Sequence, residues 1–225
     1  MSYTIAFDVY GTLIDRSGVY NSLKELIGKK AKPFMDMWRD KQLEYSFRRG
    51  LMNTYVDFSI CTKEALDYSC LRFDIHLTIK QKEDLMNEYN FLPMFSDVDN
   101  GLQQLKDKGH NLYAFSNGSQ YAVTNLLKNA KIIEYFEGVI SVENTKTFKP
   151  DPVVYKYFST QTNSTKEDSW LVSSNPFDVI GAISYGMKSA WIQRKPESIF
   201  DPWEIKPTIR SKSISELINK LPIER

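Results

Sequence analysis

Residues 5–15 read IAFDVYGTLID, and this stretch decides which fold the rest of the chain builds. An apolar run, Ile5 to Phe7, leads directly to a single acid, Asp8, which is followed by Gly11 and Thr12. A short apolar run bounded by such turn residues indicates a strand that is buried on both faces. An ionised carboxylate at the end of a buried strand is costly unless a cation or several N–H groups meet it. The stretch therefore predicts a buried strand that ends in a functional carboxylate.

The composition favours a protein that acts on a small molecule. The chain has 225 residues, enough for a core domain with a smaller accessory domain. Its 29 Lys and Arg residues against 28 Asp and Glu residues give a net charge of +1, and no basic run is long enough to follow a nucleic acid. The first residues, MSYTIAFD, lack the pattern of a signal peptide, and no window approaches a membrane span. We expect a cytoplasmic protein with no nucleic-acid or membrane partner.

The chain has two cysteines, Cys61 and Cys70, too few for a disulfide framework. No His or Cys partners of the kind that a zinc site requires lie near them. We expect buried or partly buried free thiols, with a local bridge between the two as the alternative.

Four further apolar runs resemble the first, and helical patterns separate them. This alternation of strand and helix predicts an α/β fold with a Rossmann-like parallel sheet covered on both faces. The tail from Pro196 to Pro207 is predicted to be irregular, before a last helix near Ile214 to Leu221. The five expected strands are Thr4–Val9, Leu112–Ser116, Gly138–Val142, Ser169–Ser173 and Lys188–Ile192.

About a hundred residues separate the first expected strand from the second, and they contain no convincing strand. Helical patterns from Val19 to Tyr89, broken by Gly28, Pro33 and Gly50, predict three to five helices. Because ligands bind at the carboxyl ends of parallel strands, an insert that leaves the first strand there would cover the site as a cap. We expect a catalytic core formed by residues 1–14 and 92–225, and a helical cap subdomain at residues 15–91.

Polar groups follow the other expected strands as Asp8 follows the first, and each also has an ordinary structural explanation. Ser116 and Asn117 suit a simple turn, and Lys149 before a proline suits a solvated loop. Asn175 and Asp178, in SSNPFD, suit a helix N-cap and a capping box. Taken together, however, these groups converge on one edge of the sheet.

Four segments resemble, in order, the four sequence motifs of the haloacid dehalogenase superfamily. They are DVYGTL (8–13), FSNGS (115–119), KPDPVVY (149–155) and SSNPFDVIGA (173–182), and they span the whole core. In the expected cap, MWRDKQLEYSFRRGLM (37–52) is similar to the cap sequence of the L-2-haloacid dehalogenases. The resemblance implies hydrolysis of (S)-2-haloalkanoic acids to (R)-2-hydroxy acids, with small 2-haloalkanoates, water and halide as partners.

Tyr10 separates this chain from most members of that superfamily, which are magnesium-dependent phosphatases or phosphomutases with a second Asp at this position. A carboxylate that approaches a phosphate needs a cation to screen the like charges. A 2-haloalkanoate carries one negative charge, away from the carbon that is attacked. The ammonium of Lys149 can then keep Asp8 ionised, so we expect neither a metal nor a cofactor.

The resemblance also implies a role for each site residue. Asp8 attacks C2 and expels halide with inversion, and water then hydrolyses the aspartyl ester. Arg39, Asn117 and Phe177 would hold the halide, and Ser116 with nearby backbone N–H groups the substrate carboxylate. Asp178 is expected to be the base of the second step. Thr12, Ser173 and Asn175 would orient Lys149 and the water, Tyr155 would support them, and Tyr10, Leu43 and Phe58 would contact the alkyl group.

Two other readings stay open on the sequence alone: a magnesium-dependent phosphatase with an unusual first motif, and a non-catalytic binding relative. Tyr10 disfavours the first, and the retention of all four strand-end groups disfavours the second. The resemblance also implies a homodimer, for which aromatic residues expected to be exposed in the cap (Tyr45, Phe47 and Tyr55) are candidate interface residues; a monomer is the alternative.

Overall fold

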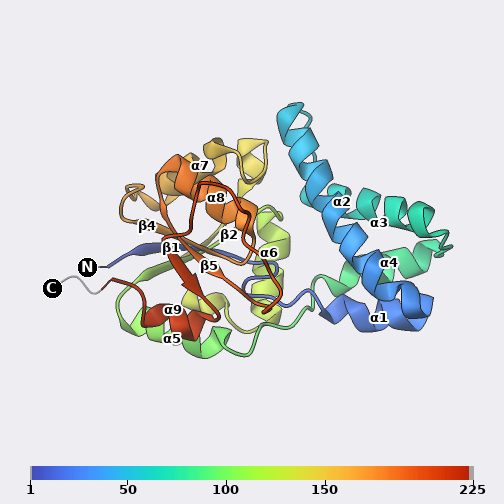
Figure 1. Ribbon diagram of the computed structural model, residues 1–225, viewed down its shortest axis with the longest axis horizontal. Helices are drawn as coiled ribbons and strands as arrows, with labels where there is room; N and C mark the ends of the chain where they lie inside the picture. The colour runs from blue at the N-terminus through green and yellow to red at the C-terminus, as the bar shows by residue number, and fades with distance from the viewer. Residues whose placement is uncertain (1, 223–225) are drawn as a thin grey trace.

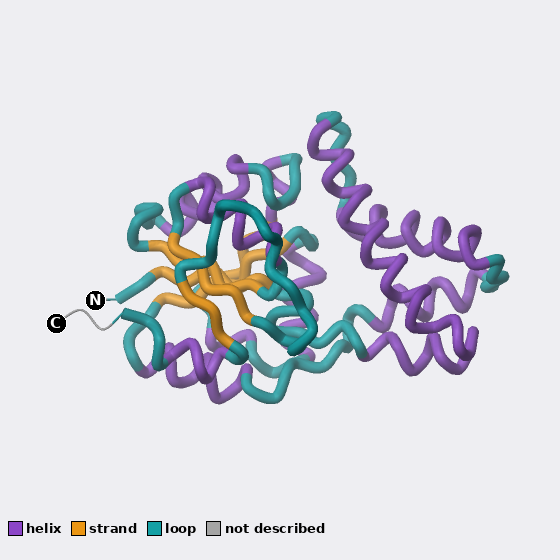
Figure 2. The backbone as a smooth tube through the Cα atoms, viewed as in Figure 1, coloured by secondary structure: helices purple, strands orange, loops and turns teal. Residues whose placement is uncertain are grey.

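The computed structural model describes residues 2–222, and in this part of the chain it contains one sheet of six parallel strands. The order across the sheet is β3-β2-β1-β4-β5-β6, so β1 lies in the middle and the chain winds outward from it in both directions (Figures 1 and 2). The strands are β1 (Thr4–Asp8), β2 (Asn111–Ser116), β3 (Gly138–Ser141), β4 (Ser169–Ser173), β5 (Lys188–Ile192) and β6 (Ile209–Ser211).

β1 is buried on both faces because helices cover both faces of the sheet. Ile5 and Phe7 pack into a core that includes residues of helices α5, α6 and α9, whereas Ala6 packs into a second core with α7 and α8. Along the edge where the strands end, Asp8 pairs in register with Phe115 of β2, and Phe7 pairs with Val172 of β4. The carboxyl ends of β1, β2 and β4 therefore meet around Asp8.

The helices form two layers on the sheet and a separate group beside it. In Figure 1, α7 and α8 lie on one side of the sheet, α5 and α9 lie together on the other, and α1 to α4 stand apart from both layers. The helices are α1 (Gly18–Ile27), α2 (Ala31–Leu51), α3 (Phe58–Phe73), α4 (Ile79–Glu88), α5 (Val98–Asp107), α6 (Gln120–Asn129), α7 (Pro152–Thr162), α8 (Pro176–Tyr185) and α9 (Ile214–Ile218), with 3-10 turns η1 (Gly28–Lys30), η2 (Ile133–Tyr135) and η3 (Val142–Thr145).

Helices α1 to α4 follow β1 in the chain and pack mainly on one another. On α2, Phe34 and Trp38 are almost fully buried, and the Trp38 indole Nε1 donates a hydrogen bond to the Thr62 carbonyl of α3 at 2.8 Å. This spacing of four residues places both rings on one face of the helix. The division into a core of residues 1–14 and 92–225 and a cap of residues 15–91 stays a prediction.

Local sequence signals set the ends of several helices. Thr78 and Gln81 form a reciprocal capping box at the start of α4, and Asp151 accepts from the Val153 N–H ahead of α7. α8 begins at Pro176 and is followed by Gly186, whose φ of 111° is the left-handed conformation that glycine adopts without strain.

The sequence predicted most of this architecture but missed two elements. All five expected strands are present, and no end is displaced by more than one residue. β6 was not expected, because three residues after an irregular stretch give little periodic signal; it extends the sheet beyond β5. α5 was also not identified, and α9 is shorter than the helix expected from Ile214 to Leu221.

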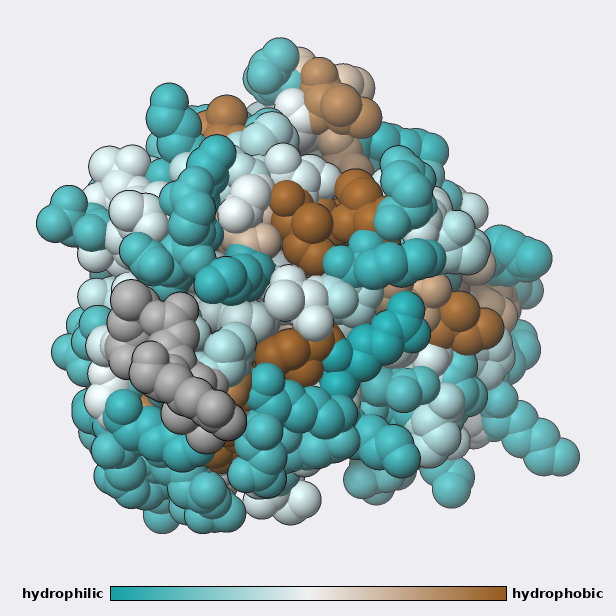
Figure 3. All heavy atoms as spheres, turned by 60° about the vertical axis from the view of Figure 1, so that its left-hand side comes forward, coloured by the Kyte–Doolittle hydropathy of each residue, from teal (hydrophilic) through white to brown (hydrophobic). Residues whose placement is uncertain are grey.

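The expectation of free thiols is confirmed, since Cys61 and Cys70 are both free and buried. No helix within residues 2–222 is long and apolar enough to cross a membrane. The face drawn in Figure 3 is largely hydrophilic, with apolar side chains gathered in separate patches.

Replacement of Gly181 by alanine is expected to destabilise the fold. A Cβ atom on this residue of α8 would lie 2.5 Å from the Tyr155 hydroxyl and 2.7 Å from Cβ of Pro150. We expect urea denaturation of Gly181→Ala to show a free energy of unfolding lower by about 1–3 kcal/mol, although alanine favours helix by about 1 kcal/mol. Gly138→Ala is the control, because its Cβ would meet only Tyr113 ring atoms at 3.7 Å. Equal stability of the Gly181→Ala variant and the parent would contradict the packing.

Candidate active site

The site lies where β1, β2 and β4 end. Asp8, Ser116 and Ser173 are the last residues of these three strands, and all three are buried. Lys149 reaches the same place from the loop ahead of α7, and its side chain is only 2% exposed. Three strands and one loop that are far apart in sequence therefore place one carboxylate, two hydroxyls and one ammonium at a single edge of the sheet.

The two oxygens of the Asp8 carboxylate have different surroundings. Oδ2 accepts three hydrogen bonds, listed here by donor: Thr12 Oγ1 at 2.7 Å, Asn175 Nδ2 at 2.7 Å and Ser173 Oγ at 3.2 Å. Oδ1 has one contact among the described residues, with the Lys149 ammonium at 3.5 Å. Hydrogen bonds from fixed donors hold the carboxylate in one orientation. Oδ1 is left as the oxygen that is available to an electrophile.

Lys149 lies between two carboxylates. Its Nζ is 2.8 Å from Oδ2 of Asp178 and 3.5 Å from Oδ1 of Asp8, and it also donates to the Phe115 carbonyl at 2.8 Å. The backbone N–H of Lys149 donates to Oδ1 of Asn117 at 3.0 Å. A buried ammonium needs compensating charge and full hydrogen bonding, and this arrangement supplies both. The predicted contact between Lys149 and Asp8 is present, but Asp178 is the nearer partner.

The Asp178 carboxyl has no solvent exposure. Burial raises its pKa above the ordinary aspartate value, the Lys149 ammonium opposes that rise, and the charge of Asp8 adds to it. Tyr155 donates from its hydroxyl to Oδ1 of Asp178 at 2.8 Å, and burial together with the Asp178 charge raises the pKa of Tyr155 well above its usual range. The tyrosine thus serves Asp178 as a neutral donor.

The structure decides against the capping interpretation of Asn175 and Asp178. Asn175 precedes α8 but makes no side-chain cap; its amide donates to Asp8 instead, and Asp178 is bound to Lys149 and Tyr155. At the end of β2, the Ser116 hydroxyl accepts from the Gly118 N–H at 3.1 Å, as in a turn. A Ser side chain and backbone N–H groups are thus close together ahead of α6.

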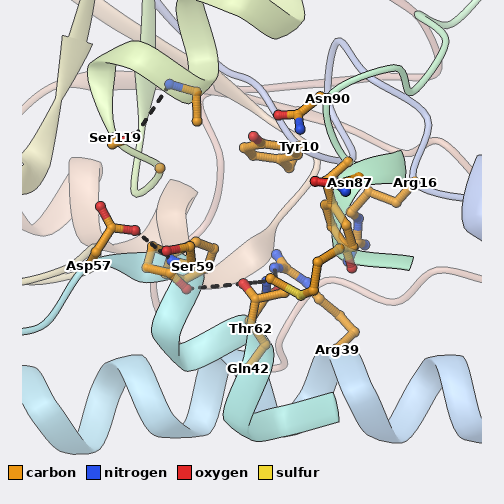
Figure 4. Close-up of a pocket in the computed structure, with 15 residues that line it drawn as sticks. Tyr10, Arg16, Arg39, Gln42, Asp57, Ser59, Thr62, Asn87, Asn90 and Ser119 are labelled. Atoms are coloured by element: carbon orange, nitrogen blue, oxygen red, sulfur yellow. Dashed lines mark hydrogen bonds between the residues drawn. The ribbon is translucent and has the colours of Figure 1, made fainter. Parts of the chain in front are cut away.

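A cavity of about 310 Å³ opens beside this edge, between the sheet and helices α2 to α4 (Figure 4). Tyr10 and Phe58 line it, as does Arg39. Burial lowers the pKa of Arg39 to about 9, and the like charge of Arg16 contributes. Burial also raises the pKa of Tyr10, so its hydroxyl stays protonated.

Three of the predicted contacts around the cavity look different in the structure. Arg39 donates to Oε1 of Gln42 at 2.6 Å and to Oδ1 of Asn175 at 3.4 Å, and within residues 2–222 no hydrogen bond joins it to Asn117. Phe177 packs edge-on against Phe47 of α2 at 5.2 Å and, like Leu43, does not line the cavity. Helix α2 turns by about 100° per residue, so Gln42 faces the cavity and Leu43 does not.

Several residues of the site were not identified from the sequence. Ser174 donates its backbone N–H to Oγ1 of Thr12 at 2.8 Å, and Arg194 donates from Nε and Nη2 to the Thr12 carbonyl at 3.0 and 2.6 Å. These contacts fix the turn that carries Thr12. The cavity also includes Arg16 and Tyr89, which stand outside the four motifs. Ser174 lies inside a motif and could have been found there; the two arginines have no such signal.

Among residues 2–222, no cluster of three or more His, Cys, Asp and Glu side chains is arranged to hold a metal ion. The Lys149 ammonium supplies positive charge at the carboxyl edge of the sheet.

The model of the haloacid dehalogenase-like hydrolases matches residues 5–192, which include every strand-end group described above. The chain belongs to this family. An (S)-2-haloacid dehalogenase of Pseudomonas putida is 33% identical over 96% of this chain and 95% of its own length. The L-2-haloacid dehalogenase of Xanthobacter autotrophicus has a similar structure, with a TM-score of 0.88, 28% identity and coverage of 97% of this chain and 98% of that one. A structure of the same dehalogenase with chloropropionic acid covalently bound gives a TM-score of 0.88 at 27% identity, with the same coverage of both chains.

Lys149 is expected to stabilise the fold as well as to position the site. Removal of its ammonium in Lys149→Met leaves Asp8 and Asp178 buried without a cation, so the free energy of unfolding should fall by about 3–5 kcal/mol at neutral pH. Burial raises the pKa of Asp178 in the folded state, so the cost of its unpaired charge is present above that pKa and is relieved as pH falls through it. Urea denaturation across pH 5–8 measures this change.

The double variant Lys149→Met, Asp178→Asn should recover part of the lost stability at neutral pH, because one of the two unpaired charges is then absent. Lys156→Met, on the exposed face of α7, is the matched control. A Lys149→Met loss that does not depend on pH would mean that the ammonium does not neutralise the two acids.

Proposed function

We propose that this chain hydrolyses (S)-2-haloalkanoic acids to (R)-2-hydroxy acids through an aspartyl ester, with inversion at C2. The observation that carries this proposal is the Asp8 carboxylate: three donors hold Oδ2, while Oδ1 has a single hydrogen bond among the described residues, from Lys149. The similarity to (S)-2-haloacid dehalogenases over nearly the whole chain supports the substrate class. The bound chloropropionic acid in the Xanthobacter structure supports a covalent intermediate.

In the first step, Oδ1 of Asp8 forms a bond to C2 while the carbon–halogen bond breaks and the halide leaves with the bonding electrons. Attack from the side opposite the halogen inverts C2. Holding Oδ2 in place orients the carboxylate before the substrate arrives, so little reorganisation is needed at the transition state.

In the second step, water attacks Cγ of Asp8, and the bond between Cγ and Oδ1 breaks. Negative charge then develops on Oδ2, which already receives hydrogen bonds from Thr12, Ser173 and Asn175. These three donors form an oxyanion hole for the tetrahedral intermediate. The product leaves with Oδ1 as its hydroxyl oxygen, so C2 keeps its inverted configuration and Asp8 takes its new oxygen from water.

We assign the base of the second step to Asp178. Its raised pKa makes it a stronger proton acceptor than an ordinary carboxylate, and Lys149 connects it to Asp8. Tyr155 is a positioning residue that holds Oδ1 of Asp178. The proton taken from water passes to the product alkoxide as the ester bond breaks.

Arg39 would stabilise the departing halide, because its guanidinium lines the cavity and contacts the same Asn175 side chain that binds Asp8. Asn117 and Phe177 complete this cradle in our proposal. Ser116 and the N–H groups ahead of α6 would bind the substrate carboxylate. Tyr10 and Phe58 offer apolar contacts to the alkyl group, with Leu43 behind them.

The reaction needs no metal or cofactor in this proposal. The Lys149 ammonium occupies the space between Asp8 and Asp178, and Tyr10 stands where phosphatases of the superfamily have a second acid. A single cation of this kind suits attack on a neutral carbon better than attack on a phosphate.

We also propose that the chain works as a cytoplasmic homodimer. The aromatic residues expected to be exposed are not: Tyr45, Phe47 and Tyr55 are half-buried against other rings. Exposed apolar residues at the ends of α2 and α3 are better candidates, because Leu51 is 86% and Leu71 is 83% exposed. Buried free thiols suit a reducing compartment.

Chloride release from racemic 2-chloropropionate in the presence of EDTA tests the activity. We expect metal-independent conversion of the (S) form to (R)-lactate, which chiral chromatography would detect. We expect no hydrolysis of p-nitrophenyl phosphate in the presence of magnesium. Asp8→Asn should lower kcat by on the order of 10⁴-fold or more, whereas Asp36→Asn, on the exposed face of α2, should not. Phosphate release instead of chloride would refute the proposal.

A single turnover in heavy-oxygen water tests the ester. The label should enter Asp8 and be absent from the first-turnover hydroxy acid, as mass spectrometry of protein and product would show. Label in that first product would mean direct attack of water on C2. Asn175→Ala should slow the second step more than the first, so that the ester accumulates.

The raised pKa of Asp178 predicts where kcat falls on the acid side of its pH profile. Activity should fall as pH drops through a pKa above the ordinary aspartate range, because protonation removes the base. The Tyr155 hydrogen bond lowers this pKa, so Tyr155→Phe should move the limb to higher pH. Tyr157→Phe, on the outer part of α7, is the control. A limb that stays in place would exclude Asp178 as the titrating group.

A further inference from the structure

Two arginines line the cavity without an ion-pair partner in the described part of the chain, although the charge of Asp8 reaches both. Arg16 and Arg39 both line it, and within residues 2–222 neither forms an ion pair. Arg39 donates only to the neutral side chains of Gln42 and Asn175. Both side chains are half-buried, and a partly desolvated cation without an ion-pair partner is costly. The like charge of Arg16 also helps to lower the pKa of Arg39. The cavity is therefore built to receive negative charge.

Among the described residues, the Arg16 guanidinium has no hydrogen-bond partner. Its Nε is buried and unsatisfied within the described part of the chain, and no other atom of its guanidinium makes a hydrogen bond there. A Cβ atom on Gly11 would lie 3.0 Å from this Nε, so the absence of a side chain at Gly11 leaves room for the guanidinium. A buried donor of this kind costs stability unless a ligand completes it.

Acids near Arg16 are committed elsewhere. Asp8, the first of the acids whose charge acts on Arg16, is already bound by the three donors on Oδ2 and by Lys149. Asp15 accepts from the Ser17 N–H and hydroxyl, and Asp36 pairs with Lys32. Asp57, which also lines the cavity, accepts from the Ser59 N–H at the start of α3 and is drawn on the opposite side from Arg16 in Figure 4. The protein thus leaves Arg16 to an external partner.

A simple haloalkanoate does not use Arg16. The proposed chemistry places its carboxylate at Ser116 and its halogen at Arg39. A water molecule takes up about 30 Å³, so the cavity of about 310 Å³ has room beyond a three-carbon acid. The amides of Asn87 and Asn90 line the cavity with Arg16, and Figure 4 draws both on its side. Their polarity suits a charged end group and not an alkyl chain.

We propose that Arg16, with Asn87 and Asn90, binds a second carboxylate at the far end of the substrate, so that 2-halodicarboxylic acids are the preferred substrates. This inference rests on the proposed dehalogenation and deepens it. An Arg guanidinium presents several donors in a fork that matches a carboxylate, which makes it a selective receptor and not only a positive charge.

The test compares (S)-2-chlorosuccinate with (S)-2-chlorobutanoate, which have the same carbon count and differ in the terminal carboxylate. The ratio of their kcat/KM values should favour chlorosuccinate in the wild type. In Arg16→Met that ratio should fall by about 10- to 100-fold, the range for loss of a hydrogen-bonded charged group. Arg16→Lys should retain part of the preference. Arg72→Met, on the exposed surface of α3, is the matched control and should leave the ratio unchanged.

Binding of inert analogues gives a readout apart from turnover. Isothermal titration of the intact protein should show succinate binding more tightly than butanoate, and Arg16→Met should remove the difference. Equal binding of the two acids, or an equal loss for both substrates in Arg16→Met, would overturn the second-carboxylate site while leaving dehalogenation intact. Failure of the wild type to release chloride from either substrate would instead refute the proposed function. Arg16→Lys, which keeps the buried charge, separates an effect on folding from an effect on recognition.

Discussion

The site depends on one ammonium group held between two carboxylates inside the protein. Lys149 satisfies Asp178 at 2.8 Å and approaches Asp8 at 3.5 Å, and all three side chains are almost completely shielded from solvent. Three charges of this kind are tolerated only if each has partners, and the chain supplies them from β2, α7 and the start of α8. The parallel sheet matters because it brings these remote segments to one edge. The fold and the charge arrangement therefore depend on each other. Without the sheet the charged groups would be solvated, and without the ammonium two carboxylates that repel each other would lie at its carboxyl edge.

The unequal contacts of the Asp8 oxygens explain how one carboxylate can act twice in the proposed reaction. The oxygen with one contact is free to become the ester oxygen, and the oxygen with three donors is prepared for the charge of the second step. The same donors therefore orient the group in one step and stabilise it in the next. The second step therefore needs no hydrogen-bond donor beyond those that already hold the buried Asp8 carboxylate in place.

Much of the fold and the centre of the site could be predicted from the sequence, because both depend on local patterns. Apolar runs gave the strands, and the rule that parallel strands share one carboxyl edge was enough to place Asp8, Ser116 and Ser173 together. Side-chain direction could not be predicted. Asn175 looked like a helix cap, yet its amide turns toward Asp8, and Leu43 points away from the cavity that its neighbour Gln42 lines. Arg16 lies outside the four motifs, and the role of an arginine in a loop depends on the residues that surround it in the folded protein. The edge strand β6 is too short to show periodicity.

The buried lysine and its two acids also carry a consequence for the history of such a protein. Buried ionic groups are seldom the most stable choice for a protein interior. Three well-packed apolar residues of similar volume commonly give an equal or higher free energy of unfolding. Selection for robustness alone would erode this cluster, so its survival in a lineage requires continued use of its chemistry. Substitutions that raise thermal stability would therefore have to lie outside this cluster, while the carboxyl edge of the central strands keeps its charged groups.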